Sequence, residues 1–266
     1  MRNILSVMLL NQYLENIIKV FNMDEYKKSL RSDIGKTKEY YEKSMMKTEQ
    51  QKLLEKLLVY DEVFHQAKNI ADIACGGGAL SFHLAHINNA SDFTLVDYMQ
   101  ESIEISKKNN RKFSDKFSFS QGDIYNLNYS DNCFDIVFCW QTLSWLENPK
   151  QALNELVRVV KSGGKIYLSS LFNFNHDVDI YSKVYDYTRE SGKNGIATNY
   201  NTYSQFTVNK WLEHQVQSFK IHQFSTSVPF EYTGKGLGTY TKKSEDELMQ
   251  ISAGMLMNWG ILEIKK

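Results

Sequence analysis

The chain has 266 residues, enough for one sizeable domain or one domain with a cap, and 42% of them are hydrophobic, enough for a real core. Lysine and arginine total 31 and aspartate and glutamate total 31, so the net charge gives no reason to expect a nucleic-acid or anionic-membrane partner. The 3 cysteines form no Cys-x-x-Cys pair, which favours a reduced, cytoplasmic protein over a secreted disulfide scaffold.

Residues 1–65 are predicted to form a helical cap. The apolar start at residues 4–10 lacks a small-residue cleavage site, so we interpret it as part of an amphipathic helix rather than a signal peptide. The apolar residues at helical spacing are Leu10, Leu14, Ile17, Ile18 and Phe21, and later Leu53, Leu54, Leu57, Leu58 and Val63. No apolar run approaches the ~20 residues that a membrane-spanning helix needs, so no membrane span is expected.

Residues 66–266 are predicted to form one α/β domain. Strands are expected at 69–74, 92–97, 116–121, 134–139 and 164–171, with helices at 79–88, 100–110 and 149–160. Strands that alternate with helices predict a doubly wound, mostly parallel sheet with right-handed crossovers.

Beyond this alternation the composition changes. Residues 172–206 are rich in Asn, Tyr, His, Asp and Gly, which indicates an insertion over the carboxyl end of the sheet, where such folds bind ligands. A helix at 207–216, a strand at 219–224, a hairpin within 239–251 and a strand at 259–264 are expected to follow. A last strand that is reached through a hairpin predicts an antiparallel strand at the sheet edge.

The most informative segment is residues 69–80, an apolar run that contains Asp72, ends in three consecutive glycines and leads into a helix. A strand, a glycine turn and a helix N-terminus allow the backbone to approach a ligand closely and turn N–H groups toward it. A second strand ends in Asp97, at a distance along the chain that suits hydrogen bonding to ribose hydroxyls. The segment therefore predicts a nucleoside-containing cofactor.

A series of motifs between residues 69 and 171 resembles the class I S-adenosylmethionine-dependent methyltransferases. The matching motifs are residues 72–78 (Asp-Ile-Ala-Cys-Gly-Gly-Gly), 96–99 (Val-Asp-Tyr-Met), 122–124 (Gly-Asp-Ile), 134–140 (Phe-Asp-Ile-Val-Phe-Cys-Trp) and 156–164. Ala74 replaces the usual first glycine, and Ser144-Trp145 stands where many relatives carry His-His. A nicotinamide-binding Rossmann unit is the alternative, but Ser81 occupies the third glycine position of its Gly-x-Gly-x-x-Gly pattern.

The resemblance implies a Rossmann-like methyltransferase sheet, mostly parallel with an antiparallel edge strand, plus the N-terminal helical cap. It also implies S-adenosylmethionine as cofactor and S-adenosylhomocysteine as product. Asp72 would fix the glycine loop or meet the cofactor amino group through water, Asp97 would bind the ribose, and Asp123 would accept from the adenine amino group, unless Asp123 is only a turn residue. The residues expected to contact the cofactor are Asp72, Ala74, Gly76, Gly78, Asp97, Tyr98, Met99, Asp123, Ile124 and Trp140. No His/Cys/Asp/Glu cluster has metal-ligand spacing, so no metal is expected.

The implied reaction is an SN2 methyl transfer, for which His176 is the candidate general base because an imidazole titrates near neutral pH. Gln141 is the second candidate catalytic residue, since it could orient the acceptor after the fourth strand. Substrate contacts are expected from Tyr41, Trp145 and Asp177. The alternatives are ordinary packing for Trp145, a solvated loop for His176, and helix packing rather than a cofactor lid for Tyr40 and Tyr41.

The leading hypothesis is a methyltransferase that acts on an oxygen of a small molecule. Residues 238–242, 249–252 and 257–262 look like parts of methyltransferases from bacterial surface-glycan clusters, which would imply capsule biosynthesis and a sugar or phosphoramidate acceptor. An RNA methyltransferase and a noncatalytic adenosylmethionine-binding domain are the alternatives. Neither the acceptor nor the oligomeric state can be read from the sequence.

Overall fold

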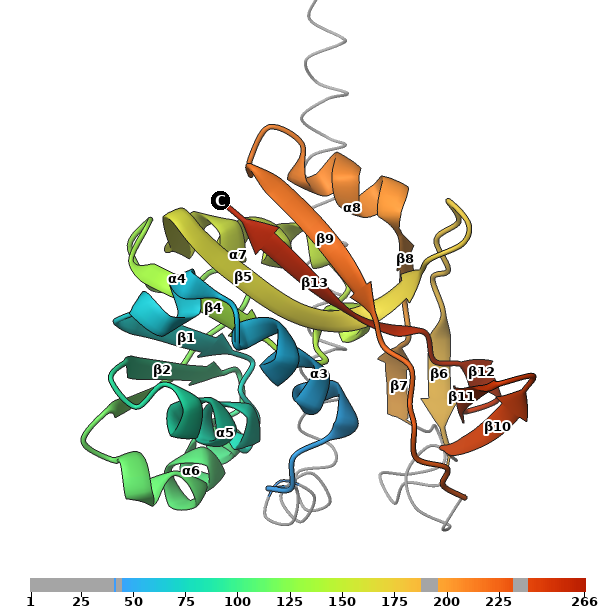
Figure 1. The fold of residues 1–266 in the computed structure, drawn as a ribbon, viewed down its shortest axis with the longest axis horizontal. Coiled ribbons are helices and arrows are strands. Elements are labelled where there is room, and N and C mark those ends of the chain that lie inside the picture. The colour runs from blue at the N-terminus through green and yellow to red at the C-terminus, as the bar shows by residue number, and fades with distance from the viewer. Residues whose placement is uncertain (1–40, 42–44, 188–195, 232–238) are drawn as a thin grey trace, which may run out of the picture.

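The computed structural model describes residues 41, 45–187, 196–231 and 239–266. An eight-stranded sheet lies at its centre, with seven strands in the order β3-β2-β1-β4-β5-β13-β9 and β8 paired to β5 (Figure 1). Its strands are β1 (Asn69–Ile73), β2 (Asp92–Asp97), β3 (Phe117–Gln121), β4 (Phe134–Cys139), β5 (Val160–Asn173), β8 (Thr202–Ser204), β9 (Ser218–Gln223) and β13 (Trp259–Lys265). The doubly wound, mostly parallel sheet that the sequence predicts is therefore confirmed.

The antiparallel strand is β13, and its position corrects the prediction. β13 pairs antiparallel with β5 on one side and with β9 on the other, so it lies one place inside the edge and β9 is the edge strand. β9 precedes β13 in the chain, and β13 is inserted between β9 and β5. The inner position suits β13 because its sequence is the more apolar and both of its faces are buried. The burial pattern supports this reason: Trp259–Ile264 is mostly buried, whereas β9 alternates between exposed and half-buried residues.

Helices cover both faces of the sheet. They are α3 (Glu49–Leu58), α4 (Glu62–Gln66), α5 (Ala79–Ile87), α6 (Gln100–Asn109), α7 (Pro149–Val159) and α8 (Gln205–Leu212), with 3-10 turns η1 (Arg111–Phe113) and η2 (Leu143–Trp145). One buried apolar cluster contains residues of α3, α4, α5 and α6, and a second contains residues of α7 and α8. Successive β5 residues enter different clusters, Ile166 the second and Tyr167 the first, as the two faces of a pleated strand require.

Helix α8 begins and ends earlier than the sequence pattern predicts. Ser204 is its N-cap and accepts a hydrogen bond from the Thr207 backbone N–H, so the first turn forms at Gln205 rather than at 207. The chain then leaves helical geometry after Leu212, and His214 takes a left-handed φ of 63°.

The two described cap helices are anchored to the sheet by Asp61. Its carboxylate caps α4, where it accepts from the Val63 N–H at 2.9 Å, and it also accepts from the Tyr167 hydroxyl on β5. Lys165 lies 3.2 Å from the same carboxylate. Residues 1–40, including the predicted amphipathic helix, lie outside the described residues, and the division into a 1–65 cap and a 66–266 domain stays a prediction.

Two segments extend beyond the carboxyl end of β5 and meet there. The predicted insertion carries β6 (Lys183–Asp186), β7 (Ile196–Asn199) and β8, and the predicted hairpin is β10 (Tyr240–Ser244) with β11 (Glu247–Ser252), followed by β12 (Met255–Leu256). Figure 1 shows β6 and β7 beside β10, β11 and β12. A third buried cluster joins them: Leu171, Tyr200, Met257 and Trp259, with Trp145, Val184, Phe224 and Met255 packed against it. Within the ranges that the structure describes, no helix is both long and apolar enough to cross a membrane.

Candidate cofactor and acceptor site

The turn after β1 is built from residues in left-handed backbone geometry. Ala74, Gly76 and Gly78 have φ values of 61°, 53° and 74°. Glycine adopts this region freely, whereas an L-residue such as alanine pays ~1–2 kcal/mol for it. Ala74 thus departs from the expected glycine in side chain but keeps the conformation that a glycine would have there.

Asp97 at the end of β2 is directly bonded to this glycine turn. One carboxylate oxygen accepts from the Gly76 N–H at 2.9 Å and the other from the Met99 N–H at 2.9 Å. The side chain is buried, and burial raises the pKa of Asp97 while the two amide hydrogen bonds lower it. Each carboxylate oxygen can accept more than one hydrogen bond, so the pair of oxygens can also receive two hydroxyl donors. The structure therefore brings together the two acidic-strand and glycine motifs that the sequence singled out.

Asp72 lies in β1 beneath the same turn and is 1% exposed. One oxygen accepts from the Ser81 hydroxyl at 2.6 Å, and the other is buried with no hydrogen-bond partner among the described residues. Burial, with the nearby Asp97 charge, raises the pKa of Asp72 to about 7, although the Ser81 hydrogen bonds oppose this shift. A buried acceptor without a donor is costly, and a bound ammonium group would satisfy it. This oxygen fits the amino group of an amino-acid-containing cofactor.

Gly78 allows close packing of the turn on α6. A Cβ atom at Gly78 would overlap the Ser106 hydroxyl and the Asn110 amide, and Asn110 Nδ2 donates to the Gly78 carbonyl at 3.2 Å. Gly78 is also the N-cap of α5, and no side chain caps that helix. The first turn of α5 therefore has no side-chain cap, and the Ser81 backbone is hydrogen-bonded to Asp72.

Tyr41 covers the outer side of the glycine turn. A Cβ atom at Gly76 would lie 2.8 Å from the Tyr41 ring, and one at Gly77 would lie 2.9 Å from the Tyr41 Cβ. Asn109 joins Tyr41 to the glycine turn, because its Nδ2 donates to the carbonyls of Gly77 at 3.0 Å and of Tyr41 at 3.3 Å. A role of Tyr41 as a cofactor lid stays a prediction, and Tyr40 lies outside the described residues.

The carboxyl end of β3 carries the residues predicted to face the adenine. Asp123 Oδ1 accepts from the Tyr125 N–H at 3.0 Å, so one oxygen stabilises the turn. Ile124 is buried at 8% exposure, and Met99 at the end of β2 is buried at 9%. Tyr98 is half-buried, and its carbonyl accepts from Gln121 Nε2 at 2.9 Å. Asp123 therefore has both a turn role and a second carboxylate oxygen that can serve a ligand.

The loop after β4 connects the cap to the insertion. Trp140 is half-buried, and its indole N–H is buried with no partner in the described part of the chain. Gln141 has a left-handed φ of 51°, and its Nε2 donates to Gln50 Oε1 at 3.2 Å. Trp145 donates its indole N–H to the Gln141 carbonyl and packs edge-on against Tyr200, with ring centroids 4.2 Å apart.

His176 and Asp177 lie in the turn after β5, and both side chains are exposed. Among the described residues, no hydrogen bond joins either side chain to Gln141 or Trp145. The structure thus places Gln141 and Trp145 in one loop, where a hydrogen bond joins them. The role of His176 as a general base stays a prediction.

Several residues of this region were missed by the sequence reasoning. Ser81 was noted only as a departure from the nicotinamide pattern, yet it is the donor to Asp72. Gln50 carried a weaker signal, a polar residue at a helical position that turns out to be 5% exposed. Tyr200 and Trp259 carried no signal beyond their aromatic character. Where the structure describes the chain, no three His, Cys, Asp or Glu side chains gather as a metal site would require.

Comparison with known proteins identifies the family. Residues 64–226, more than half of the chain, match the family model of the methyltransferase domain, and the chain belongs to this family. The ubiquinone biosynthesis O-methyltransferase of Coxiella burnetii is 26% identical over 126 residues, which cover 47% of this chain and 53% of that protein. The mitochondrial enzyme of the same name from Schizosaccharomyces pombe is 30% identical over 118 residues, 41% of this chain and 42% of that protein. The chain thus spans about half the length of the curated relatives it matches.

Solved structures give the same fold. YcgJ from Bacillus subtilis aligns with a TM-score of 0.55 at 14% identity, over 81% of this chain and 97% of that one. A protein from Methanosarcina mazei described as a SAM-dependent methyltransferase aligns with a TM-score of 0.53 at 15% identity, over 79% and 96%. At these identities the likeness concerns the fold alone.

Proposed function

We propose that the chain binds S-adenosylmethionine and transfers its methyl group to an oxygen of a small molecule. The observation that carries this proposal is the contact between Asp97 and the Gly76 amide, which ties the acid after β2 to the left-handed turn after β1. The buried, unpartnered oxygen of Asp72 beneath the same turn supports an amino-acid-containing cofactor. Membership of the methyltransferase family agrees with both.

In this proposal the amino group, the ribose and the adenine of the cofactor each have a partner. The Asp72 carboxylate holds the amino group, Asp97 accepts from the ribose hydroxyls, Asp123 accepts from the adenine amino group, and Met99 and Ile124 pack beside the base. The glycine turn lets the backbone approach, and Tyr41 covers it. When bound, the cofactor supplies a methyl group on a positively charged sulfur, so the protein has mainly to align donor and acceptor, which can contribute ~7–11 kcal/mol.

An acceptor hydroxyl would lose its proton as its oxygen takes the methyl group that the cofactor would supply. Gln141 and Trp145 orient the acceptor, and His176, with Asp177, receives the proton. General-base assistance of this kind contributes roughly 10²–10⁴-fold. An acceptor that is already ionised would not need His176, so the effect of removing that imidazole reports on the acceptor class.

The acceptor is the finer part of the proposal. Relatives named as ubiquinone biosynthesis O-methyltransferases support oxygen as the methylated atom. A capsule or surface-glycan precursor is the acceptor that the motifs at residues 238–242, 249–252 and 257–262 favour. Met257 and Trp259, from the last of these motifs, lie in the third buried cluster, against which Trp145 packs. The three free cysteines support the cytoplasm as the compartment.

Calorimetric titration with S-adenosylmethionine and S-adenosylhomocysteine tests the cofactor. We expect micromolar binding by the wild-type chain and at least a tenfold loss in Asp97→Ala, since a buried charged hydrogen bond is worth about 1.5–3 kcal/mol. Asp92→Ala, an exposed acid at the other end of β2, is the matched control and should bind as the wild type does. Absence of binding by folded wild-type protein would refute the proposal.

Transfer is then followed with a labelled methyl donor and two acceptor panels, phenols and sugar nucleotides. Product in either panel supports an O-methyltransferase and selects the acceptor class. Cofactor binding without product in any panel, and without RNA methylation, would instead favour a noncatalytic binding domain.

A further inference from the structure

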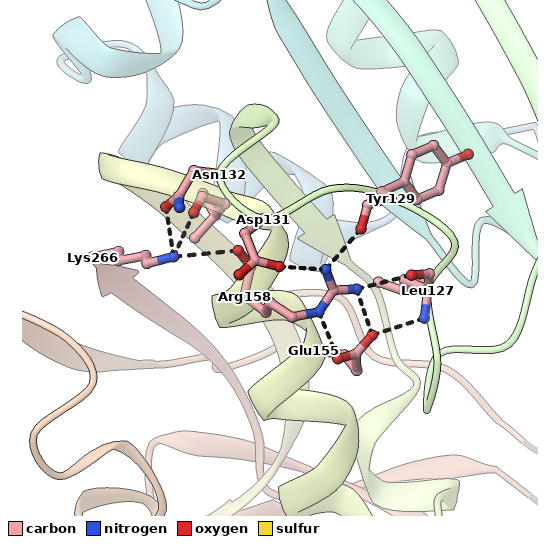
Figure 2. A network of polar contacts seen from close by, with 8 residues as sticks. Leu127, Tyr129, Asp131, Asn132, Glu155, Arg158 and Lys266 are labelled. Atoms are coloured by element: carbon pink, nitrogen blue, oxygen red, sulfur yellow. Dashed lines mark hydrogen bonds and ion pairs between the residues drawn. The ribbon is translucent and has the colours of Figure 1, made fainter.

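Arg158 on α7 holds the loop between β3 and β4 by main-chain contacts (Figure 2). Its Nη2 donates to the Leu127 carbonyl at 2.8 Å, and its Nη1 donates to the Tyr129 carbonyl at 2.7 Å and to the Asp131 carboxylate at 2.8 Å. The Asp131 side chain is 68% exposed, so that ion pair contributes little. The two carbonyl contacts are the ones that fix the path of the loop.

Glu155, one turn earlier on α7, completes the clamp. Its two oxygens accept from Arg158 Nε and Nη2, both at 2.8 Å, which is the bidentate geometry that guanidinium and carboxylate groups favour. The same carboxylate accepts from the Leu127 N–H at 2.8 Å. Both polar groups of the Leu127 main chain are therefore bound to one ion pair on α7, as Figure 2 shows.

A second set of contacts connects this clamp to Asp123. Gln151 on α7 donates to the Tyr125 carbonyl at 3.0 Å, and the Tyr125 hydroxyl accepts from the N–H groups of Glu147 and Asn148. The Tyr125 N–H in turn donates to Asp123 Oδ1 at 3.0 Å. The main chain at Tyr125, Leu127 and Tyr129 is thus bound by side chains of α7, and Asp123 is joined to this series through the Tyr125 N–H.

We propose that Arg158, together with Glu155, is a positioning residue for recognition of the adenine amino group: it fixes the loop whose first residue, Asp123, presents the accepting carboxylate. This inference rests on the proposed function, because Asp123 is an adenine partner only if the cofactor is S-adenosylmethionine. Arg158 itself touches no cofactor and acts through the loop. A lysine cannot replace it, since one ammonium group cannot bind a carboxylate in two places and two carbonyls at once.

The test compares two ligands that differ at the 6-position of the purine and in the proton that this change places on N1. S-adenosylhomocysteine carries the amino group, and S-inosylhomocysteine carries a carbonyl oxygen in its place. Calorimetry should give a wild-type preference of roughly tenfold or more for the adenosyl compound, because Asp123 accepts from the one and repels the other. Arg158→Met and Arg158→Lys should reduce this preference to about threefold or less. Arg111→Met, at an exposed arginine outside the clamp, should leave it unchanged.

A merely structural role would weaken both ligands by the same factor and leave the preference intact, which would overturn the inference. Far-ultraviolet circular dichroism checks folding, and Glu155→Gln, which keeps shape and loses charge, provides a second variant if Arg158→Met does not fold. Equal wild-type affinity for the two ligands would overturn the inference and leave the proposed function standing. Failure of the wild type to bind either ligand would overturn both.

Discussion

Gln50 of the cap helix and Gln141 of the loop after β4 are 91 residues apart in sequence and share a hydrogen bond of 3.2 Å between their side-chain amides. Gln50 Oε1 accepts a second hydrogen bond from the Ser169 hydroxyl on β5, at 2.9 Å. One buried amide oxygen thus joins the cap, the fourth strand's loop and the fifth strand. Gln141 itself has a left-handed backbone conformation that glutamine rarely adopts.

Gln50→Ala is expected to destabilise the protein by about 1–2 kcal/mol, because two donors lose their acceptor in a buried place. Hydrogen exchange should accelerate selectively in α3 and in the loop after β4. Chemical denaturation and exchange mass spectrometry measure the two effects. Lys56→Ala on the exposed side of α3 is the control and should stay within about 0.5 kcal/mol of the wild type. Exchange rates in α3 of Gln50→Ala that equal those of the wild type would contradict the role of Gln50 in joining α3 to the loop after β4.

Ala74→Gly is expected to stabilise the protein by about 1 kcal/mol, since it removes the Cβ strain of a left-handed alanine. Thermal or chemical denaturation measures the change. Ala85→Gly, in the middle of α5, is the matched control with the opposite expected sign, because glycine in a helix costs ~1 kcal/mol relative to alanine and a buried methyl group is lost as well. A lower stability of Ala74→Gly would show that the alanine side chain contributes packing that outweighs its strain.

Asp72 should make cofactor binding depend on pH. Its pKa in the folded protein is raised to about 7, so the carboxylate that would hold an amino group is mostly protonated at pH 6 and mostly ionised at pH 8. The affinity for S-adenosylhomocysteine should therefore increase roughly tenfold between those pH values. Calorimetry at both pH values measures this change, and Asp72→Asn, which cannot ionise, should bind with little pH dependence.

The same shift has a consequence for stability. A carboxyl whose folded pKa lies above its unfolded value binds protons more tightly when folded, so its ionisation opposes folding as pH rises from about 4 to about 7. Relative to the wild type, unliganded Asp72→Asn should gain stability over this range, by up to about 4 kcal/mol. A stability difference that does not change with pH would show that Asp72 is not the titrating group.

Glu263 should have the opposite pH dependence. The His222 hydrogen bond at 2.9 Å and the Lys165 ammonium at 2.8 Å hold the pKa of Glu263 at about 2, against opposing burial. A depressed folded pKa contributes stability that is complete above about pH 4.5 and is lost as pH falls toward 2. Glu263→Gln should cost about 1–2 kcal/mol at neutral pH, after allowance for solvent screening of a partly exposed group, and almost nothing near pH 2.

Chemical denaturation across this pH range measures the difference between the two proteins. Glu247→Gln, at an exposed position in β11, is the control and should match the wild type throughout. A Glu263→Gln deficit that persists at low pH would indicate lost packing rather than lost charge.

The sequence was most informative where the chain is buried on both faces. The continuous apolar run of β4 and the strand that contains Asp72 could be placed within a residue or two, because such strands have few alternative environments. The glycine turn and Asp97 were each predicted to contact the cofactor, and the carboxyl ends of neighbouring parallel strands do meet at one edge of the sheet. The direct hydrogen bond between the Gly76 N–H and the Asp97 carboxylate was not predicted, because it depends on the loop conformation and on the side-chain rotamer.

Other features depend on contacts that local pattern does not encode. The fifth strand was expected at 164–171, but β5 begins at Val160 and contains both Gly163 and Gly164; Gly163 takes a φ of 80°, and the pairing with β4 shifts register. These glycines form a bulge rather than an end. The position of β13 between β5 and β9 depends on pairing between segments that are distant in sequence. The long-range hydrogen bonds of Gln50 and Arg158 do so as well, and residue spacing alone could not predict them.

The third buried cluster, around Tyr200 and Trp259, is separate from the two clusters that stabilise the sheet. Its members come mainly from the insertion before α8 and from the segment between β9 and β13. Mutations there change a small local core and leave the packing beneath the glycine turn as it was. Under the proposed function, exchanging or lengthening these two surface segments would alter the acceptor side of the site and leave the residues around the glycine turn in place.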